Sequence, residues 1–233
     1  MHKIALSEAA LKRMTGRTGK LHPFDEIDPR KAALVVIDMQ NYFCKQGHQG
    51  EVPASRDIVP NINRLATELR GRGGLVVWVR NGTRDTRESW SNYHEFLHSS
   101  DRCERRYAAM DVDGDGYAYW HLNDIRPDDA QVTKTRYSAF IHGSSNIEAL
   151  LRDKGIDTLL IAGTATNVCC ESSARDAMML NFKTIMVSDA LATHNDEEHN
   201  ASLSIFYGLF GDVQNVVEAI QSLERGDKTR AAA

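Results

Sequence analysis

The stretch Leu34–Gln40 reads LVVIDMQ, four apolar residues followed directly by a carboxylate. An apolar run this short, without polar residues at alternate positions, is typical of a strand buried on both faces of a parallel sheet. Four runs have this character: Ala33–Ile37, Leu75–Val79, Thr158–Ala162 and Thr184–Val187. A weaker strand is expected over Gln131–Thr133, and Val213–Val217 could be an edge strand or the start of the last helix.

Helical patterns separate these runs. In Pro60–Arg72 the apolar residues share one face, and in Ser145–Lys154 the residues Ser145 and Glu148 predict a capping box at the helix start. A third helix is expected from about Val168 to Leu180. Strands that alternate with helices predict an α/β fold, a doubly wound, mostly parallel sheet in a Rossmann-like three-layer α/β/α arrangement.

The chain reads as a single domain, residues 31–222, with an N-terminal extension (1–30) and a flexible tail (223–233). Residues 83–130 are charged and aromatic and show little apolar periodicity. An insertion of this length in a compact domain is usually functional, so we expect it to form a wall of a pocket.

Composition excludes several classes of function. The 233 residues carry 28 basic and 32 acidic side chains, a net charge of −4, which argues against binding of nucleic acid or of anionic membranes. No apolar run approaches the roughly 18–20 residues that a bilayer requires, and the N-terminus lacks the apolar segment of a secretory signal, so we expect a cytoplasmic protein. The four cysteines match no zinc motif and are expected as free thiols.

Three side chains that could carry chemistry follow predicted strands, where parallel sheets bind their ligands. Asp38 could act as a base or could cap the next turn, with neither preferred from position alone. Cys169 is expected in the first turn of a helix, where the dipole favours a thiolate, although a buried cysteine is often only a core residue. Lys134 could keep a neighbouring carboxylate and thiol anionic, or could be an ordinary solvated lysine.

At these residues the sequence resembles the isochorismatase-like cysteine hydrolases. Val35–Gln40 looks like the first-strand motif of that family, Lys134 stands at the position of its lysine, and Gly163–Cys169 looks like its nucleophile loop. The resemblance implies that Asp38 accepts the proton, that Lys134 assists and that Cys169 is the nucleophile. It also implies a cis peptide between Thr164 and Ala165, and an oxyanion hole made by the Ala165 and Cys169 N–H groups.

The resemblance also separates branches of the family. Isochorismatases proper cleave a vinyl ether and lack the cysteine, so Cys169 favours an amidase. Nicotinamidases hold a metal with an Asp and several His after the first strand, and Gly47–Val52 lacks that pattern, so we expect no metal and no nicotinamide as substrate. The mechanism that the resemblance implies requires no cofactor. Lys134–Phe140 and Asn167–Cys169 look closest to the ureidoacrylate and N-carbamoyl amidohydrolase branch.

We therefore expect a cysteine-dependent amidohydrolase that cleaves a C–N bond of a small amide or ureido compound through a thioester. A hydrolase of a vinyl ether or an ester, or a catalytically silent binding protein of the same fold, stays open. The family suggests a homodimer or homotetramer. Candidate substrate-binding residues are Asn41, Asn81, Trp90, Arg136 and Tyr137, and a substrate carboxylate could be held by Arg80, Arg136 or Arg175.

Overall fold

The computed structural model describes residues 1–232 and contains one parallel six-stranded sheet in the order β3-β2-β1-β4-β5-β6. The strands are β1 (Ala32–Ile37), β2 (Leu75–Asn81), β3 (Ala130–Lys134), β4 (Thr158–Thr164), β5 (Lys183–Ala192) and β6 (Asp212–Gln214). The order reverses between β1 and β4, because β2 and β3 add on one side of β1 and the later strands add on the other. Ligands bind at such a switch point, at the carboxyl ends of the strands.

Ten α-helices surround the sheet within residues 1–232. They are α1 (Glu8–Thr18), α2 (Asn41–Cys44), α3 (Val59–Gly71), α4 (Thr86–Ser89), α5 (Ser91–Phe96), α6 (Ser100–Met110), α7 (Ile147–Asp153), α8 (Glu171–Met179), α9 (Asp196–Leu209) and α10 (Val216–Ala232). None of these helices has the length and apolar character that crossing a membrane requires.

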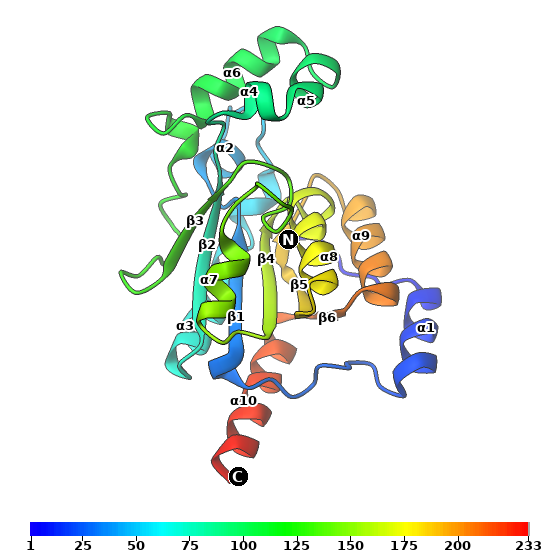
Figure 1. Ribbon diagram of the computed structural model, residues 1–233. Coiled ribbons are helices and arrows are strands. Elements are labelled where there is room, and N and C mark those ends of the chain that lie inside the picture. Colours follow the sequence, from blue (N-terminus) through cyan, green and yellow to red (C-terminus); the bar gives the residue numbers. More distant parts are fainter. Residues whose placement is uncertain (233) are drawn as a thin grey trace.

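Two apolar cores cover the two faces of the sheet. In β1 the alternate residues Ala33, Val35 and Ile37 face a core shared with α1, α7, α8 and α9, whereas Leu34 and Val36 face a core shared with α3 and α10. Because both faces are covered, every residue of β1 is buried, and this explains the unbroken apolar run in the sequence. The predicted three-layer α/β/α fold is confirmed (Figure 1).

The structure differs from the sequence-based expectations in three places. The insertion 83–130 contains the helices α4, α5 and α6, which lie beyond the carboxyl ends of the strands (Figure 1). In α7 the cap residue is Asn146 and not Ser145, whose hydroxyl donates to Ala139 O, so the capping box is not formed. Residues 223–232 of the expected flexible tail continue α10, and residue 233 lies outside the described part of the chain.

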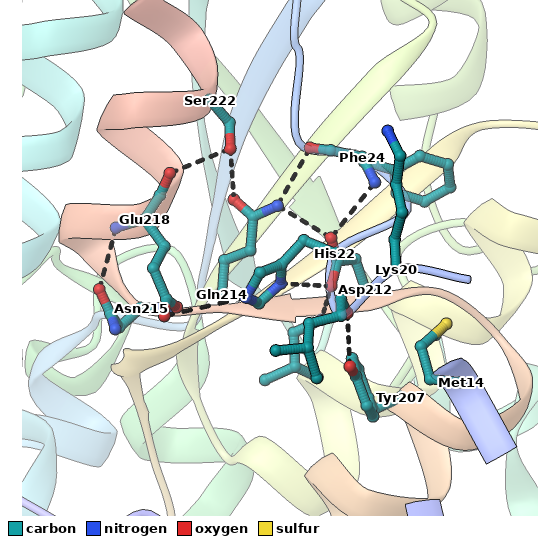
Figure 2. A network of polar contacts seen from close by, with 12 residues as sticks. Met14, Lys20, His22, Phe24, Tyr207, Asp212, Gln214, Asn215, Glu218 and Ser222 are labelled. Atoms are coloured by element: carbon teal, nitrogen blue, oxygen red, sulfur yellow. Dashed lines mark hydrogen bonds and ion pairs between the residues drawn. The ribbon is translucent and has the colours of Figure 1, made fainter. Parts of the chain in front are cut away.

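The N-terminal extension is joined to the domain on two sides. Helix α1 packs against α9, with Ala10 and Met14 in the core. The segment after α1 enters a buried polar network, in which His22 Nδ1 lies 3.0 Å from Asp212 Oδ1, and Gln214 Nε2 donates to both Phe24 O and Asp212 Oδ2 (Figure 2). Residues 1–30 are therefore an integral part of the folded unit.

Candidate active site

Asp38 is the first residue after β1, at the switch point of the sheet. Its side chain is fully buried, and its backbone adopts a φ of 56°, in the left-handed region that non-glycine residues rarely occupy. The Asp38 N–H still donates to Val79 O at 2.8 Å, so the chain leaves the sheet only after this residue. Backbone strain of this kind often occurs at functional sites.

Lys134, the last residue of β3, forms a buried ion pair with Asp38. Lys134 Nζ lies 2.9 Å from Asp38 Oδ2, and both side chains are completely shielded from solvent. The ammonium also donates to Arg136 O at 3.0 Å. Burial is the largest single effect and lowers the pKa of Lys134, but the charges and hydrogen bonds of Asp38 and Cys169 together outweigh burial and hold that pKa above its ordinary value. Lys134 therefore stays a cation inside the protein.

Cys169 lies in the short π-helical segment Thr166–Cys170, between β4 and α8. Its side chain is 5% exposed. Burial is the main reason that the pKa of Cys169 is raised to about 12; Asp38 raises it further, and Lys134 partly opposes this. The expectation that a helix dipole favours a thiolate here is wrong, because Cys169 precedes α8 and because burial and the adjacent carboxylate raise its pKa. Cys169 is therefore a neutral thiol beside a carboxylate at neutral pH.

The loop before Cys169 contains the non-proline cis peptide between Thr164 and Ala165 that the resemblance implied. Ala165 and Cys169 both line a cavity of about 260 Å³. The adjacent Cys170 is fully buried in the apolar core and does not line this cavity.

The cavity is lined by segments that follow the strands, including α2 and residues 49–52 after β1, and by residues of the insertion. Among the candidate substrate-binding residues, Asn81 and Tyr137 line it, but Asn41, Trp90 and Arg136 do not. Asn41 donates to Asp115 O, and Arg136 donates to Ser89 O. Trp90 stacks on Tyr93 at 4.3 Å and meets the edge of Tyr137 at 5.1 Å, so it supports two rings of the wall.

Two functional candidates were missed from the sequence. Gln40 fixes Asn81, since its side-chain amide accepts from Asn81 N at 2.7 Å and donates to Asn81 O at 3.1 Å. Arg106 of α6 lines the cavity and donates to Asn81 Oδ1 at 3.0 Å. A signal for Arg106 exists, because it is spaced three and four residues from the buried Cys103 and Met110, on one helical face.

The three arginines first considered as carboxylate anchors have other contacts. The Arg80 guanidinium lies over Tyr117 at 4.5 Å, and Arg175 pairs with Glu171 on its own helix. None of Arg80, Arg136 and Arg175 lines the cavity. Within residues 1–232, no group of three or more His, Cys, Asp or Glu side chains is placed to hold a metal ion.

Comparison with known proteins adds to this geometry. The family model of the isochorismatase domain matches residues 32–218. Ureidoacrylate amidohydrolase RutB of Klebsiella pneumoniae is 29% identical over 211 residues, 82% of this chain and 88% of the relative. The crystal structure of a cysteine hydrolase from Pseudomonas syringae pv. phaseolicola has a TM-score of 0.73 at 26% identity, covering 86% of this chain and 95% of that one. N-carbamoylsarcosine amidase from Thermoplasma acidophilum has a TM-score of 0.64 at 25% identity, covering 80% and 96%.

Proposed function

Since this chain belongs to the isochorismatase family of hydrolases, we propose that it is a cysteine-dependent amidohydrolase of small amide or ureido compounds, with Cys169 as nucleophile. The observation that carries the proposal is a neutral, buried thiol at Cys169 beside the Asp38–Lys134 ion pair, which lies at the switch point of the sheet. The relatives RutB and N-carbamoylsarcosine amidase, whose names denote amide hydrolysis, support the same reaction class.

The reaction begins with a proton transfer. A thiol with a pKa of about 12 is almost fully protonated at neutral pH, so a base has to remove its proton as it attacks. Asp38 is that base, and Lys134 holds the carboxylate in place and stabilises negative charge on oxygen and sulfur. Among residues 1–232, no hydrogen-bond partner occupies Asp38 Oδ1, which leaves this oxygen able to accept the proton.

Attack by sulfur forms a C–S bond at the amide carbonyl, and the carbonyl electron pair moves onto oxygen. The Ala165 and Cys169 N–H groups stabilise this oxyanion. The C–N bond then breaks, Asp38 returns its proton to the leaving nitrogen, and ammonia or an amine departs from a thioester. Water, deprotonated by the same Asp38, then attacks the thioester carbonyl. The C–S bond breaks, the acid departs, and Asp38 returns the proton to the Cys169 sulfur.

The test compares Cys169→Ser with Cys170→Ala, a matched control in which the adjacent cysteine of the apolar core is changed. Ammonia release is measured from a panel of ureido acids, biuret and simple amides. We expect Cys169→Ser to lose at least about a thousandfold in rate and Cys170→Ala to lose little. If Cys169→Ser released ammonia at the wild-type rate, Cys169 could not be the nucleophile. Turnover of esters or vinyl ethers by the wild-type chain without any ammonia would favour hydrolysis of another bond.

A further inference from the structure

Arg106 presents an uncommitted cation to the cavity that Cys169 lines. Its Nη2 donates to Asn81 Oδ1 at 3.0 Å, but its buried Nε has no hydrogen-bond partner among residues 1–232. In the same part of the chain, no carboxylate lies within 4.0 Å of this guanidinium, although Arg105, the preceding residue of its helix, pairs with Asp101. A partly buried guanidinium without an anionic partner is an incomplete ion pair, since buried charges are normally paired.

The guanidinium is held in place by its surroundings. Its carbon lies 5.5 Å from the ring centroid of Tyr42 and 5.6 Å from that of Tyr93, within the range of cation–π contacts. Asn81, which positions one Nη, is itself fixed by the Gln40 amide. The group is therefore preorganised, and a ligand that binds it has little side-chain entropy to remove.

The charge of the cavity has the sign opposite to that of the whole molecule. The net charge of the chain is −4, yet none of the described residues that line the cavity is Asp or Glu. The ionisable nitrogen-containing side chains of the lining are Arg102, Arg106, His98 and His194. Such a lining favours an anionic ligand, because a concave, poorly solvated wall concentrates the field of its charges.

We infer that Arg106 is the anchor for a carboxylate of the substrate, so that the substrates are small ureido or amide acids rather than neutral amides. This inference rests on the proposed function. An arginine guanidinium is planar, and its N–H groups can bind the two oxygens of a carboxylate as a fork. Arg102 is less suited to this role, since its side chain is exposed to solvent. A cavity of about 260 Å³ admits only a compact acid, with the scissile carbonyl at Cys169 and the carboxylate at Arg106.

The first test uses a matched pair of substrates, 3-ureidopropionate and the neutral propylurea, with the full chain. We expect Arg106→Gln to raise KM for the acid by about 10- to 100-fold, the range that charge-assisted hydrogen bonds contribute, and to change propylurea kinetics by less than about threefold. Arg106→Lys keeps the charge without the fork and should recover part of the loss. Arg105→Gln, on the exposed side of the same helix, should behave as the wild type.

The second test does not depend on turnover. Iodoacetate and iodoacetamide alkylate the same sulfur and differ in charge, so the ratio of their rates at Cys169, followed by peptide mass mapping, reports attraction of an anion. We expect Arg106→Gln to lower this ratio by about 10-fold or more and Arg105→Gln to leave it unchanged. If no substrate releases ammonia, the ratio of alkylation rates still tests whether Arg106 attracts an anion to the cavity. An unchanged ratio in Arg106→Gln, or a loss that follows Arg102→Gln instead, would overturn the assignment.

Discussion

At the residue scale, Cys169 and Asp38 constrain each other. Burial and the neighbouring carboxylate together disfavour the thiolate, and the pKa of Cys169 rises to about 12. The thiol is therefore protonated at neutral pH, and in the proposed mechanism the adjacent carboxylate removes its proton as the sulfur attacks the substrate. Lys134 makes this possible, because its ammonium compensates the buried negative charge of Asp38.

Replacing Lys134 with Met tests that role. We expect at least a hundredfold loss of activity, and a fall of about 3–5 kcal/mol in the free energy of unfolding, since the change leaves a buried carboxylate without its partner. Urea unfolding followed by circular dichroism measures the stability. Lys183→Met removes a lysine of a solvent-exposed pair with Asp157 and should have almost no effect. Equal stabilities of the two variants would contradict the account of the buried pair.

The sequence allowed Asp38, Lys134 and Cys169 to be selected because each follows a strand, and the carboxyl end of a parallel strand is predictable from its apolar run. The ionisation of Cys169 could not be predicted in the same way. Local position suggested the helix dipole, whereas the depth of burial and the carboxylate from another strand decide the pKa. Both the burial of Cys169 and its distance from Asp38 depend on tertiary contacts, which cannot be deduced from a single sequence.

At the scale of elements, α5 and α6 supply part of the wall of the cavity that Cys169 lines. Trp90, at the start of α5, contacts Tyr93 and Tyr137, which both line the cavity. We expect Trp90→Ala to raise KM by about 3- to 10-fold with a smaller change in kcat, because aromatic pairs of this kind contribute about 0.5–1.5 kcal/mol. Steady-state kinetics of Phe96→Ala, a residue of α5 that is 79% exposed, provide the control. A loss confined to kcat would argue against a role in the wall.

The segment that follows α1 should give the stability a pH dependence. The hydrogen bond to Asp212 raises the pKa of His22 above its ordinary value, assisted by the charges of Asp212, Glu218 and Asp25, although burial opposes this. A histidine with a raised pKa in the folded state stabilises the protein fully below its unfolded pKa of about 6.5, and this contribution is lost as the pH rises through the folded pKa. The polar contacts involved are those of Figure 2.

The comparison is between the wild-type chain and His22→Gln in urea, at pH 5.5 and at pH 8.5. The variant should be less stable at pH 5.5, and the difference should shrink at pH 8.5, where the wild-type histidine has lost its charge. If the difference in the free energy of unfolding between the two chains grew with pH, His22 would not stabilise the fold through its protonated form.

Elements with strong apolar periodicity were predictable, and those without it were not. The strands β1, β2, β4 and β5 extend the expected runs by one to several residues. The helices of 83–130 escaped prediction because α4 and α5 are short and α6 buries only Cys103 and Met110 among charged residues. The last turns of α10 escaped it for a similar reason, since polar residues there continue a helix whose first half is held by packing.

At the scale of the whole molecule, the order of the strands assembles the site. Asp38 follows β1, Cys169 follows β4 next to it, and Lys134 ends β3, two strands away from β1 on the other side. Strand β2 lies between β3 and β1, so the side chain at position 134 has to extend across the end of β2 to reach Asp38, and a lysine is long enough to do so. The alternation of strands and helices predicted a parallel sheet, but the strand order and the fold of the first 30 residues follow from tertiary packing.

Removing residues 1–24 tests how far the N-terminal segment supports the whole fold. The deletion removes α1, whose Ala10 and Met14 are buried in the core, and so exposes the face of α9 that α1 covers. It also removes the contacts of His22 and Phe24 with Asp212. We expect the free energy of unfolding to fall by at least about 2 kcal/mol, the scale of burying one large apolar side chain. Urea unfolding measures it, and Leu97→Ala, at an exposed position, is the control. An unchanged free energy of unfolding would mean that the contacts of residues 1–24 do not stabilise the domain.

Titration of the Cys169 sulfur tests the central claim most directly, and it requires no substrate. The thiolate absorbance at about 240 nm is recorded against pH as the difference between each chain and the same chain carrying Cys169→Ser. We predict that the wild-type thiol remains protonated past about pH 10, with a pKa of about 12, and that Asp38→Asn lowers this pKa because the adjacent negative charge is gone. Ionisation of the wild-type thiol below about pH 8, unchanged by Asp38→Asn, would contradict a neutral nucleophile beside its base.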